Sequence, residues 1–205
     1  MEIQTRILEH ATQLFLKYGV KSITMDDIAR ELGISKKTIY QSFSSKADIV
    51  YQTAKSFFLK EIAQAEVICN EASNAVDELL RTLQWTINTL THISPSLIME
   101  VEKYYPQTWE VFTHFQQDYL LRLAQENLQR GISEGYFRDD LNIDIVARIR
   151  ILQIQASLST QIFPLDQFDP ISVQREILEV YAYSILTQKG KEVYHQYLTA
   201  IQASK

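Results

Sequence analysis

The sequence predicts an all-α protein, in which an N-terminal three-helix helix-turn-helix domain is joined to a C-terminal helical regulatory and dimerisation domain. Hydrophobic residues make up 46% of the 205 residues, with only 5 Gly and 4 Pro, which disfavours both a disordered chain and a turn-rich β chain. Apolar residues recur at intervals of three and four along most of the chain. We expect the first domain to span residues 1–46 and the second to span residues 47–205.

The first three helices are predicted by periodicity and by their end signals. An apolar stripe over residues 3–18 ends at Gly19, which is suited to a helix C-terminus. Thr24 precedes Asp27 by three residues, the spacing of a capping box, and predicts a short second helix up to Gly33. Ser35 is a good N-cap for a third helix over residues 36–43.

The remaining helices are predicted less sharply. A capping box from Ser45 to Asp48 opens a long fourth helix that runs to about Cys69. Pro95 and Pro106 are placed to start helices, Gly131 and Gly135 to mark a break, and Pro164 and Pro170 to frame a loop. The expected spans are residues 75–93, 95–103, 106–131, 143–163 and 172–188, followed by a last helix to about residue 202.

Charge and cysteine content limit the class of protein. The formal net charge is -5, but residues 1–50 hold seven Lys and Arg against six acids, so the N-terminal part alone is slightly basic. The single cysteine, Cys69, cannot form an internal disulfide, which fits a reducing compartment. The first residues lack the features of a signal peptide, and no apolar stretch reaches 18 residues. We therefore expect a cytoplasmic protein without a membrane segment.

The second and third helices, separated by a turn that contains Gly33, match the helix-turn-helix pattern. Ala29 is small where the two helices would cross, and Ile34 and Ile39 are apolar where the turn and the third helix would face the core. The outward face of the third helix carries donors suited to phosphates and base edges, and no acid: Lys36, Lys37, Thr38 and Tyr40. A charged face on a short helix is also compatible with plain solvated surface.

Taken together, residues 3–52 resemble the TetR family of bacterial transcriptional regulators. The matching positions are Ala11, Leu14, Phe15, Gly19, Ile23, Thr24, Asp27, Ile28, Ala29, Gly33, Ile34, Ser35, Lys36, Thr38, Ile39, Tyr40, Phe43, Lys46 and Ile49. The resemblance implies a homodimer that binds a near-palindromic operator in double-stranded DNA, acts as a repressor, and is released when a small molecule enters the C-terminal domain.

The resemblance also implies roles for individual residues. Lys36, Lys37 and Thr38, next to the N-cap Ser35, correspond to groove-facing and base-reading positions. Thr24, Tyr40 and Lys46 correspond to phosphate contacts. Many members of the family have a small residue at the position of Lys37, so this chain is expected to read different bases there and to bind DNA with a stronger electrostatic component.

Two C-terminal helices are apolar over most of their circumference and must be covered on both sides. We expect a four-helix dimer interface, as in the resembled family, built from Ile151, Ile154, Leu158, Ile177, Tyr181 and Ser184. The opposite face of the first of these helices is also apolar, with Ile145, Ile149 and Leu152 among its residues. A buried hairpin in a monomer is the alternative.

Aromatic residues concentrate between residues 85 and 119 and could line a pocket for a small apolar or aromatic effector. The candidate ligand-binding residues are Trp85, Asn88, His92, Met99, Tyr105, Trp109, Phe112 and Gln116. Such a stripe is also typical of ordinary core. Glu100 and Glu102 could hold a cationic ligand, although solvent-exposed helix charge is the favoured explanation.

An enzyme is disfavoured. The four histidines are scattered, Cys69 has no neighbouring histidine, and neither a Gly-rich phosphate loop nor a nucleophile elbow is present, so we expect no catalytic residues, no metal site and no cofactor. The predicted function is therefore ligand-controlled transcription regulation. A helical small-molecule-binding protein with a vestigial DNA-binding surface is the alternative, and an enzyme is a distant third.

Overall fold

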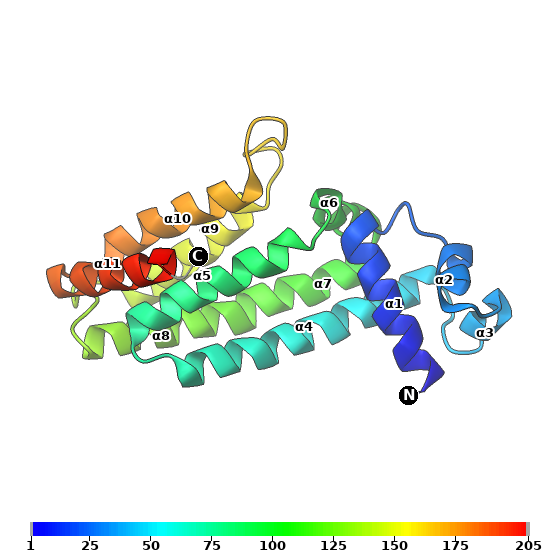
Figure 1. Ribbon diagram of the computed structural model, residues 1–205, viewed down its shortest axis with the longest axis horizontal. Coiled ribbons are helices and arrows are strands. Elements are labelled where there is room, and N and C mark those ends of the chain that lie inside the picture. The colour runs from blue at the N-terminus through cyan, green and yellow to red at the C-terminus, as the bar shows by residue number, and fades with distance from the viewer. Residues whose placement is uncertain (1, 204–205) are drawn as a thin grey trace. The chain divides into compact units, whose positions relative to one another are not determined.

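The computed structural model describes residues 2–203, apart from the side chains of Pro95 and residues 201–203, and it is built of helices (Figure 1). Between these residues the only strand-like pairing is an isolated bridge between Phe137 and Leu186. The all-α prediction is thus confirmed. The helices are α1 (Ile3–Tyr18), α2 (Met25–Leu32), α3 (Lys36–Tyr40), α4 (Lys46–Glu71), α5 (Ala75–Thr91), α6 (Pro95–Tyr104), α7 (Pro106–His114), the π-helix η1 (Phe115–Leu120), α8 (Leu121–Ser133), α9 (Ile143–Ser157), α10 (Pro170–Ile185) and α11 (Gln188–Ala203).

Several predicted boundaries are wrong. The third helix ends at Tyr40 and not at residue 43, although Phe43 still donates its N–H to the carbonyl of Ile39 at 3.0 Å. The span 106–131 is divided by a wide π turn into α7, η1 and α8. Gly131 lies inside α8 and does not end it, and the helix ends before Gly135, whose φ of 75° lies in the left-handed region. Position 131 requires glycine because the ring of Phe137 occupies the space where a side chain would be.

The ends of α9 and α10 also differ from the prediction. α9 stops at Ser157, where the backbone tightens into bonds such as that from Leu158 N–H to the Gln155 carbonyl at 3.2 Å. α10 begins earlier than expected, because Asp169 is its N-cap and accepts a hydrogen bond from Ser172 N–H at 2.9 Å. Pro170, which has no N–H to satisfy, fits the first turn. It ends at Ile185, after which the chain pairs with the segment at Phe137.

The chain divides into two compact units. The first comprises Met1–Ile62 and His92–Phe115, and the second comprises Ala63–Thr91 and Gln116–Lys205. These units describe packing and not function, so a functional boundary at residue 46 stays a prediction. No helix within the described range is both long enough and apolar enough to cross a membrane.

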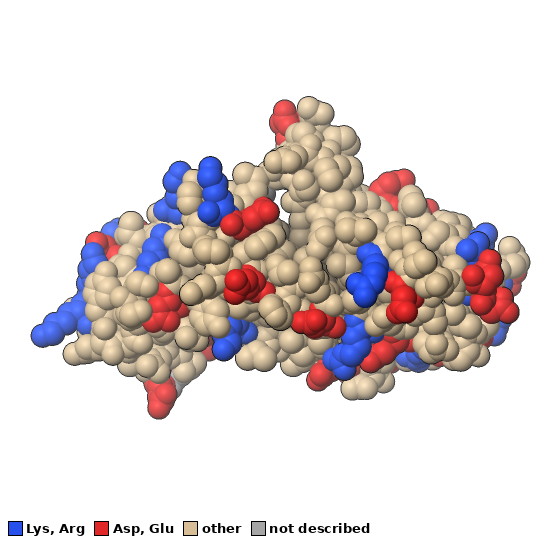
Figure 2. Space-filling model, turned by 180° about the vertical axis from the view of Figure 1, so that it is seen from behind, with Lys and Arg blue, Asp and Glu red and all other residues tan. Residues whose placement is uncertain are grey.

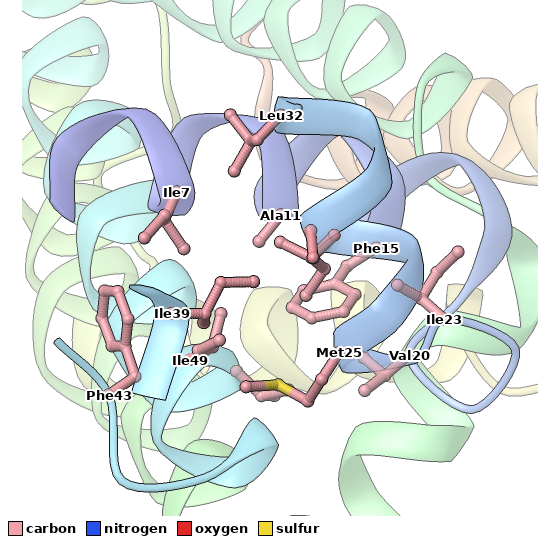
Figure 3. Close-up of a cluster of buried hydrophobic side chains, with 13 residues drawn as sticks. Ile7, Ala11, Phe15, Val20, Ile23, Met25, Leu32, Ile39, Phe43 and Ile49 are labelled. Atoms are coloured by element: carbon pink, nitrogen blue, oxygen red, sulfur yellow. The ribbon is translucent and has the colours of Figure 1, made fainter. Parts of the chain in front are cut away.

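The core of the first unit fixes α3 in place. Ile7 of α1, Ile39 of α3 and Ile49 of α4 are completely buried and lie in one cluster with Phe15 and Phe43 (Figure 3). Burial of side chains of this size stabilises the fold by about 1.5–3 kcal/mol each. The short helix α3 is therefore held by its inward Ile39, which leaves its opposite face free.

The second unit contains a partly buried ion-pair network. Arg130 of α8 donates to Glu78 of α5 at 3.0 Å, to Glu134 at 2.8 Å and to the carbonyl of Ala72 at 2.9 Å. Burial raises the pKa of the Glu78 carboxyl above its usual range, while Arg130 acts against that shift. The thiol of Cys69 lies 3.8 Å from the same carboxylate, and burial raises its pKa to about 11. The network ties the start of α5 to the end of α8.

Gly131 is expected to be indispensable for packing in this unit. A Cβ atom there would lie 2.0 Å from Cδ2 of Phe137, whose side chain is only 1% exposed. We expect Gly131→Ala to lower the free energy of unfolding by about 1–3 kcal/mol in denaturant titrations, despite the gain in helix propensity. The exposed substitution Gln129→Ala on the same helix is the control and should change it by less than about 0.5 kcal/mol. An equally or more stable Gly131→Ala protein would contradict this packing.

Candidate nucleic-acid interface

The turn between α2 and α3 depends on the backbone conformation of Gly33. Its φ of 64° lies in the left-handed region, and no atom lies within 4 Å of a Cβ built there, so conformation and not space requires glycine. Ile34 donates its N–H to the carbonyl of Ala29 at 3.0 Å, and Gly33 donates to Arg30 at 3.2 Å, which closes a Schellman motif. The chain thus leaves α2 at a defined angle and enters α3 (Figure 1).

The start of α2 carries the predicted capping box. Thr24 N–H donates to Oδ2 of Asp27 at 2.9 Å, and Asp27 N–H donates to Oγ1 of Thr24 at 3.2 Å. The Thr24 hydroxyl also donates to Oδ2 of Asp27 at 2.6 Å, and this bond, together with the one from the Thr24 N–H, lowers the pKa of the Asp27 carboxyl. Thr24 is exposed at the first turn of the helix, where unpaired backbone N–H groups and the helix dipole favour an anion.

The third helix starts as predicted, with Ser35 as its N-cap. Thr38 N–H donates to Oγ of Ser35 at 3.1 Å, and the two hydroxyl oxygens are 2.8 Å apart. Lys37 and Tyr40 are exposed, whereas Ile39 points into the core. The structure therefore places Ser35, Lys37, Thr38 and Tyr40 at the surface of one short helix, with the donors that the sequence predicts there.

Lys36 has a partner that sequence reasoning missed. Its ammonium donates to Oδ2 of Asp26 at 3.0 Å, and this hydrogen bond raises the pKa of Lys36. Asp26 belongs to the first turn of α2 and lies beside the capping residue Asp27. The two residues are ten positions apart, so only the tight turn at Gly33 brings them together. The outward surface thus includes an acid next to its cations.

Lys46 is placed differently from the other candidate contacts. Its ammonium donates to the carbonyl of Val20 at 2.6 Å, and partial burial lowers its pKa. This bond joins the start of α4 to the connection between α1 and α2. A phosphate contact would have to use the remaining N–H bonds of the same ammonium, and that role stays a prediction.

This helix-turn-helix matches a known family. The sequence profile described as "Bacterial regulatory proteins, tetR family" matches residues 7–52, the segment that runs from α1 through α3 into α4. Residues 7–52 therefore form a helix-turn-helix of the TetR type.

Matches over longer stretches of the chain agree with this finding. The chain is 26% identical over 145 residues to the HTH-type transcriptional repressor KstR2 of Mycobacterium tuberculosis (strain H37Rv), covering 69% of this chain and 72% of that protein. Its fold is similar to a transcriptional regulator from Saccharomonospora viridis solved with choline, with TM-score 0.74, 18% identity and coverage of 90% and 98%. It is also similar to FadR from Bacillus subtilis solved with stearoyl-CoA, with TM-score 0.63, 18% identity and coverage of 87% and 97%. The chain is therefore a DNA-binding transcriptional regulator of the helix-turn-helix type.

The predicted ligand-binding residues of this chain fall into both units. Trp85, Asn88 and Gln116 belong to the second unit, and the first contains His92, Met99, Tyr105, Trp109 and Phe112. Gln116 is buried on η1 and accepts a hydrogen bond from Gln155 at 3.1 Å. A role in ligand binding stays a prediction for each of them.

In the first unit, the aromatic candidates form a cluster among themselves. The rings of Trp109 and Phe112 are 4.8 Å apart, and Phe112 also contacts Phe58 of α4. Tyr105 packs against the helix-turn-helix core. Oε2 of Glu100 accepts the N–H of Lys21 at 2.7 Å, so this carboxylate, considered above for a cationic ligand, has a partner in the connection between α1 and α2.

The predicted dimer residues differ in how much surface they expose. Ile151 and Tyr181 are only 6% and 3% exposed within a single chain, which leaves them almost no surface to offer a partner. Ile154, Leu158 and Ile177 are half-buried and Ser184 is exposed. The exposed apolar face lies a fraction of a turn away: Ile145, Ile149 and Leu152 on α9, and Val180 and Tyr183 on α10.

Proposed function

We propose that this chain is a cytoplasmic repressor that binds a two-fold symmetric operator as a homodimer and releases it when an effector binds the C-terminal domain. The observation that carries the proposal is the orientation of α3. The cap at Ser35, the turn at Gly33 and the buried Ile39 hold this helix with Lys36, Lys37 and Thr38 outward. Such a helix fits the major groove, where lysine donates to guanine O6 and N7 and to phosphates.

A second set of residues would contact the sugar-phosphate backbone of the DNA. Thr24 at the start of α2, Tyr40 at the end of α3 and Lys46 at the start of α4 would bind phosphates on either side of the groove. Such contacts fix the register of the protein on the duplex without reading sequence. In this arrangement Lys36, Lys37 and Thr38 read the bases between them.

A homodimer is supported by the exposed apolar side chains of the second unit. α9 and α10 lie against each other, and both expose large apolar residues, among them Leu152 at 61% and Val180 at 58%. The loop between these helices, which projects at the top of Figure 2, carries little charge there and exposes Ile162, Leu165 and Phe168. Apolar patches of this kind mark interaction surfaces, and a second copy of the chain would cover them.

Control by a small molecule is supported by the solved relatives that hold choline or stearoyl-CoA. We place the effector among the candidate residues of the C-terminal domain, such as Trp85, Asn88 and Gln116. An effector can release DNA only if it binds more tightly to a form of the dimer whose two α3 helices no longer match successive major grooves, about 34 Å apart.

Selection of bound duplexes from a random DNA pool tests the proposal. Purified protein at moderate salt should enrich a two-fold symmetric site, and the enriched duplex then serves as the probe for effector screens. An unenriched pool, obtained with protein that is folded and dimeric, would favour a helical small-molecule-binding protein with a vestigial DNA-binding surface.

The ion pair between Asp26 and Lys36 leads to a prediction about affinity. Asp26→Asn removes a carboxylate beside the expected phosphates and frees Lys36, so operator affinity at low salt should rise about 3- to 10-fold. Glu31→Gln makes the same change of charge on the same helix and is the control, because Glu31 is not paired with Lys36. Binding titrations at two salt concentrations provide the readout, and the gain should shrink at high salt. Weaker binding by Asp26→Asn would show that Asp26 itself serves the interface.

A further inference from the structure

The second unit contains a buried cation without a counter-ion. Arg150 of α9 is only 9% exposed, and among the described residues no carboxylate lies within ion-pair distance of it. Its guanidinium lies 5.1 Å from the ring centre of Tyr181 on α10, and its buried Nη1 has no hydrogen-bond partner. Desolvation lowers the pKa of Arg150 to about 10, so the side chain is still protonated at neutral pH.

Such a charge is unfavourable in the free protein. The desolvation penalty of a buried ion that lacks a partner exceeds what a single cation–π contact returns. Buried charges in proteins are normally paired or bound to a ligand. The arrangement at Arg150 is therefore incomplete, and an anion would complete it.

Two further buried polar atoms lack partners in the same pair of helices. They are Oε1 of Gln153 on α9 and Oε1 of Gln174 on α10, and Gln174 is only 1% exposed. The Gln174 amide donates to Oγ of Ser157.

These side chains follow one line between the two helices. Arg150, Gln153 and Ser157 recur at three and four residues and so share one face of α9. Gln174 and Tyr181 are two turns apart on α10 and contact Ser157 and Arg150 respectively. We call this set of five residues the α9–α10 polar strip. It offers one cationic donor and two free acceptors, and it lies wholly within the second unit.

We propose that the α9–α10 polar strip binds an organic carboxylate, whose oxygens accept hydrogen bonds from Arg150 and whose remaining polar N–H or O–H groups donate to Gln153 and Gln174. The inference goes beyond the proposed function, because it adds a ligand site apart from the effector residues Trp85, Asn88 and Gln116. A carboxylate is favoured over a phosphate, since the strip holds a single guanidinium. One cation neutralises a monoanion, but a phosphate dianion would leave a buried charge uncompensated.

Thermal unfolding of the full chain tests this with matched probes. 3-Hydroxyoctanoate and 4-hydroxybenzoate are compared with 3-hydroxyoctanamide and 4-hydroxybenzamide, which have the same bodies and hydroxyl groups without the charge, and inorganic phosphate is a separate arm. A ligand that binds only the folded state raises the Tm in proportion to the logarithm of its concentration above Kd. We expect the carboxylates to raise the Tm in a saturable manner, and the amides and phosphate to leave it unchanged.

Two arginine variants complete the test. Arg150→Met should unfold at the same or a higher temperature than the wild type without ligand, because it removes an unpaired buried charge, and it should lose the response to carboxylates. Arg148→Met changes an exposed arginine on the same helix and should keep the response. Should the Met variant fail to fold, Arg150→Gln serves the same purpose.

Several results would overturn the proposal. They are an equal shift with the neutral amides, a shift with phosphate alone, a carboxylate response that persists in Arg150→Met, or no shift with any probe.

Dissociation of the Arg150→Met dimer in sedimentation would instead assign the missing anion to the second copy of the chain. Operator retention, measured on the same samples, separates the two proposals: retention without a carboxylate response rejects this inference alone, and a carboxylate response without retention rejects DNA regulation.

Discussion

Replacing both Lys36 and Lys37 by alanine is expected to weaken operator binding by about two orders of magnitude or more, because each lysine contact to a base edge or phosphate contributes about 1–3 kcal/mol. The fold should be unaffected, since the Lys37 side chain is exposed and the Lys36 side chain is held only by a surface ion pair. Titration of the selected operator with the purified variant measures the loss.

The salt slope of operator binding counts the phosphate contacts that are lost, and the affinities of single variants distinguish the two lysines. Each phosphate contact that is removed should reduce the slope of log K against log salt by about 0.9. Because Lys36 must exchange Asp26 for DNA, the single variant Lys37→Ala should lose more affinity than Lys36→Ala. The control is Lys55→Ala with Lys60→Ala, which removes the same charge from the exposed face of α4. Unchanged operator retention by a folded, dimeric Lys36→Ala, Lys37→Ala protein would show that α3 does not read DNA.

Arg130→Met is expected to lower the free energy of unfolding by about 3 kcal/mol at neutral pH, because it leaves the buried Glu78 carboxylate without its ion-pair partner. It also removes the hydrogen bonds to Glu134 and to the Ala72 carbonyl. Arg122→Met on the same helix is the control. Arg122 and Glu126 form an exposed pair at 3.9 Å, which should contribute less than about 1 kcal/mol.

The pH dependence of this loss identifies its cause. Burial already raises the pKa of Glu78, and removal of Arg130 should raise it further. A carboxyl whose pKa is raised on folding favours the folded state when protonated, and this contribution disappears as the pH rises through the folded-state pKa. The stability deficit of Arg130→Met should therefore be larger at pH 7 than at pH 5, and adding Glu78→Gln should reduce it. A deficit that is independent of pH would assign the loss to packing.

Local signals in the sequence were sufficient for the candidate DNA interface. The capping box at Thr24, the cap at Ser35 and the glycine turn at Gly33 each depend on residues at most five positions apart, and the structure confirms all three. Since these signals set the start of both helices and the angle between them, the sequence alone also predicts which side chains face outward.

Contacts between distant residues could not be predicted in this way. Arg130 and Glu78 are 52 positions apart, and only the packing of α5 against α8 brings them together. Periodicity predicts two apolar faces on α9 but not which one its neighbours cover. Ile151, predicted for the dimer interface, is buried within the chain, and Leu152 is exposed. The π turn at Phe115–Leu120 has no local signal that we can recognise.

The surroundings of Cys69 determine how this chain would respond to oxidants. With a pKa of about 11, only about one thiol in ten thousand is ionised at pH 7. Peroxides and electrophiles react with the thiolate, so Cys69 would be modified slowly even during oxidative stress. Occupancy of DNA by this regulator should therefore follow the concentration of its effector and not the redox state of the cell through Cys69.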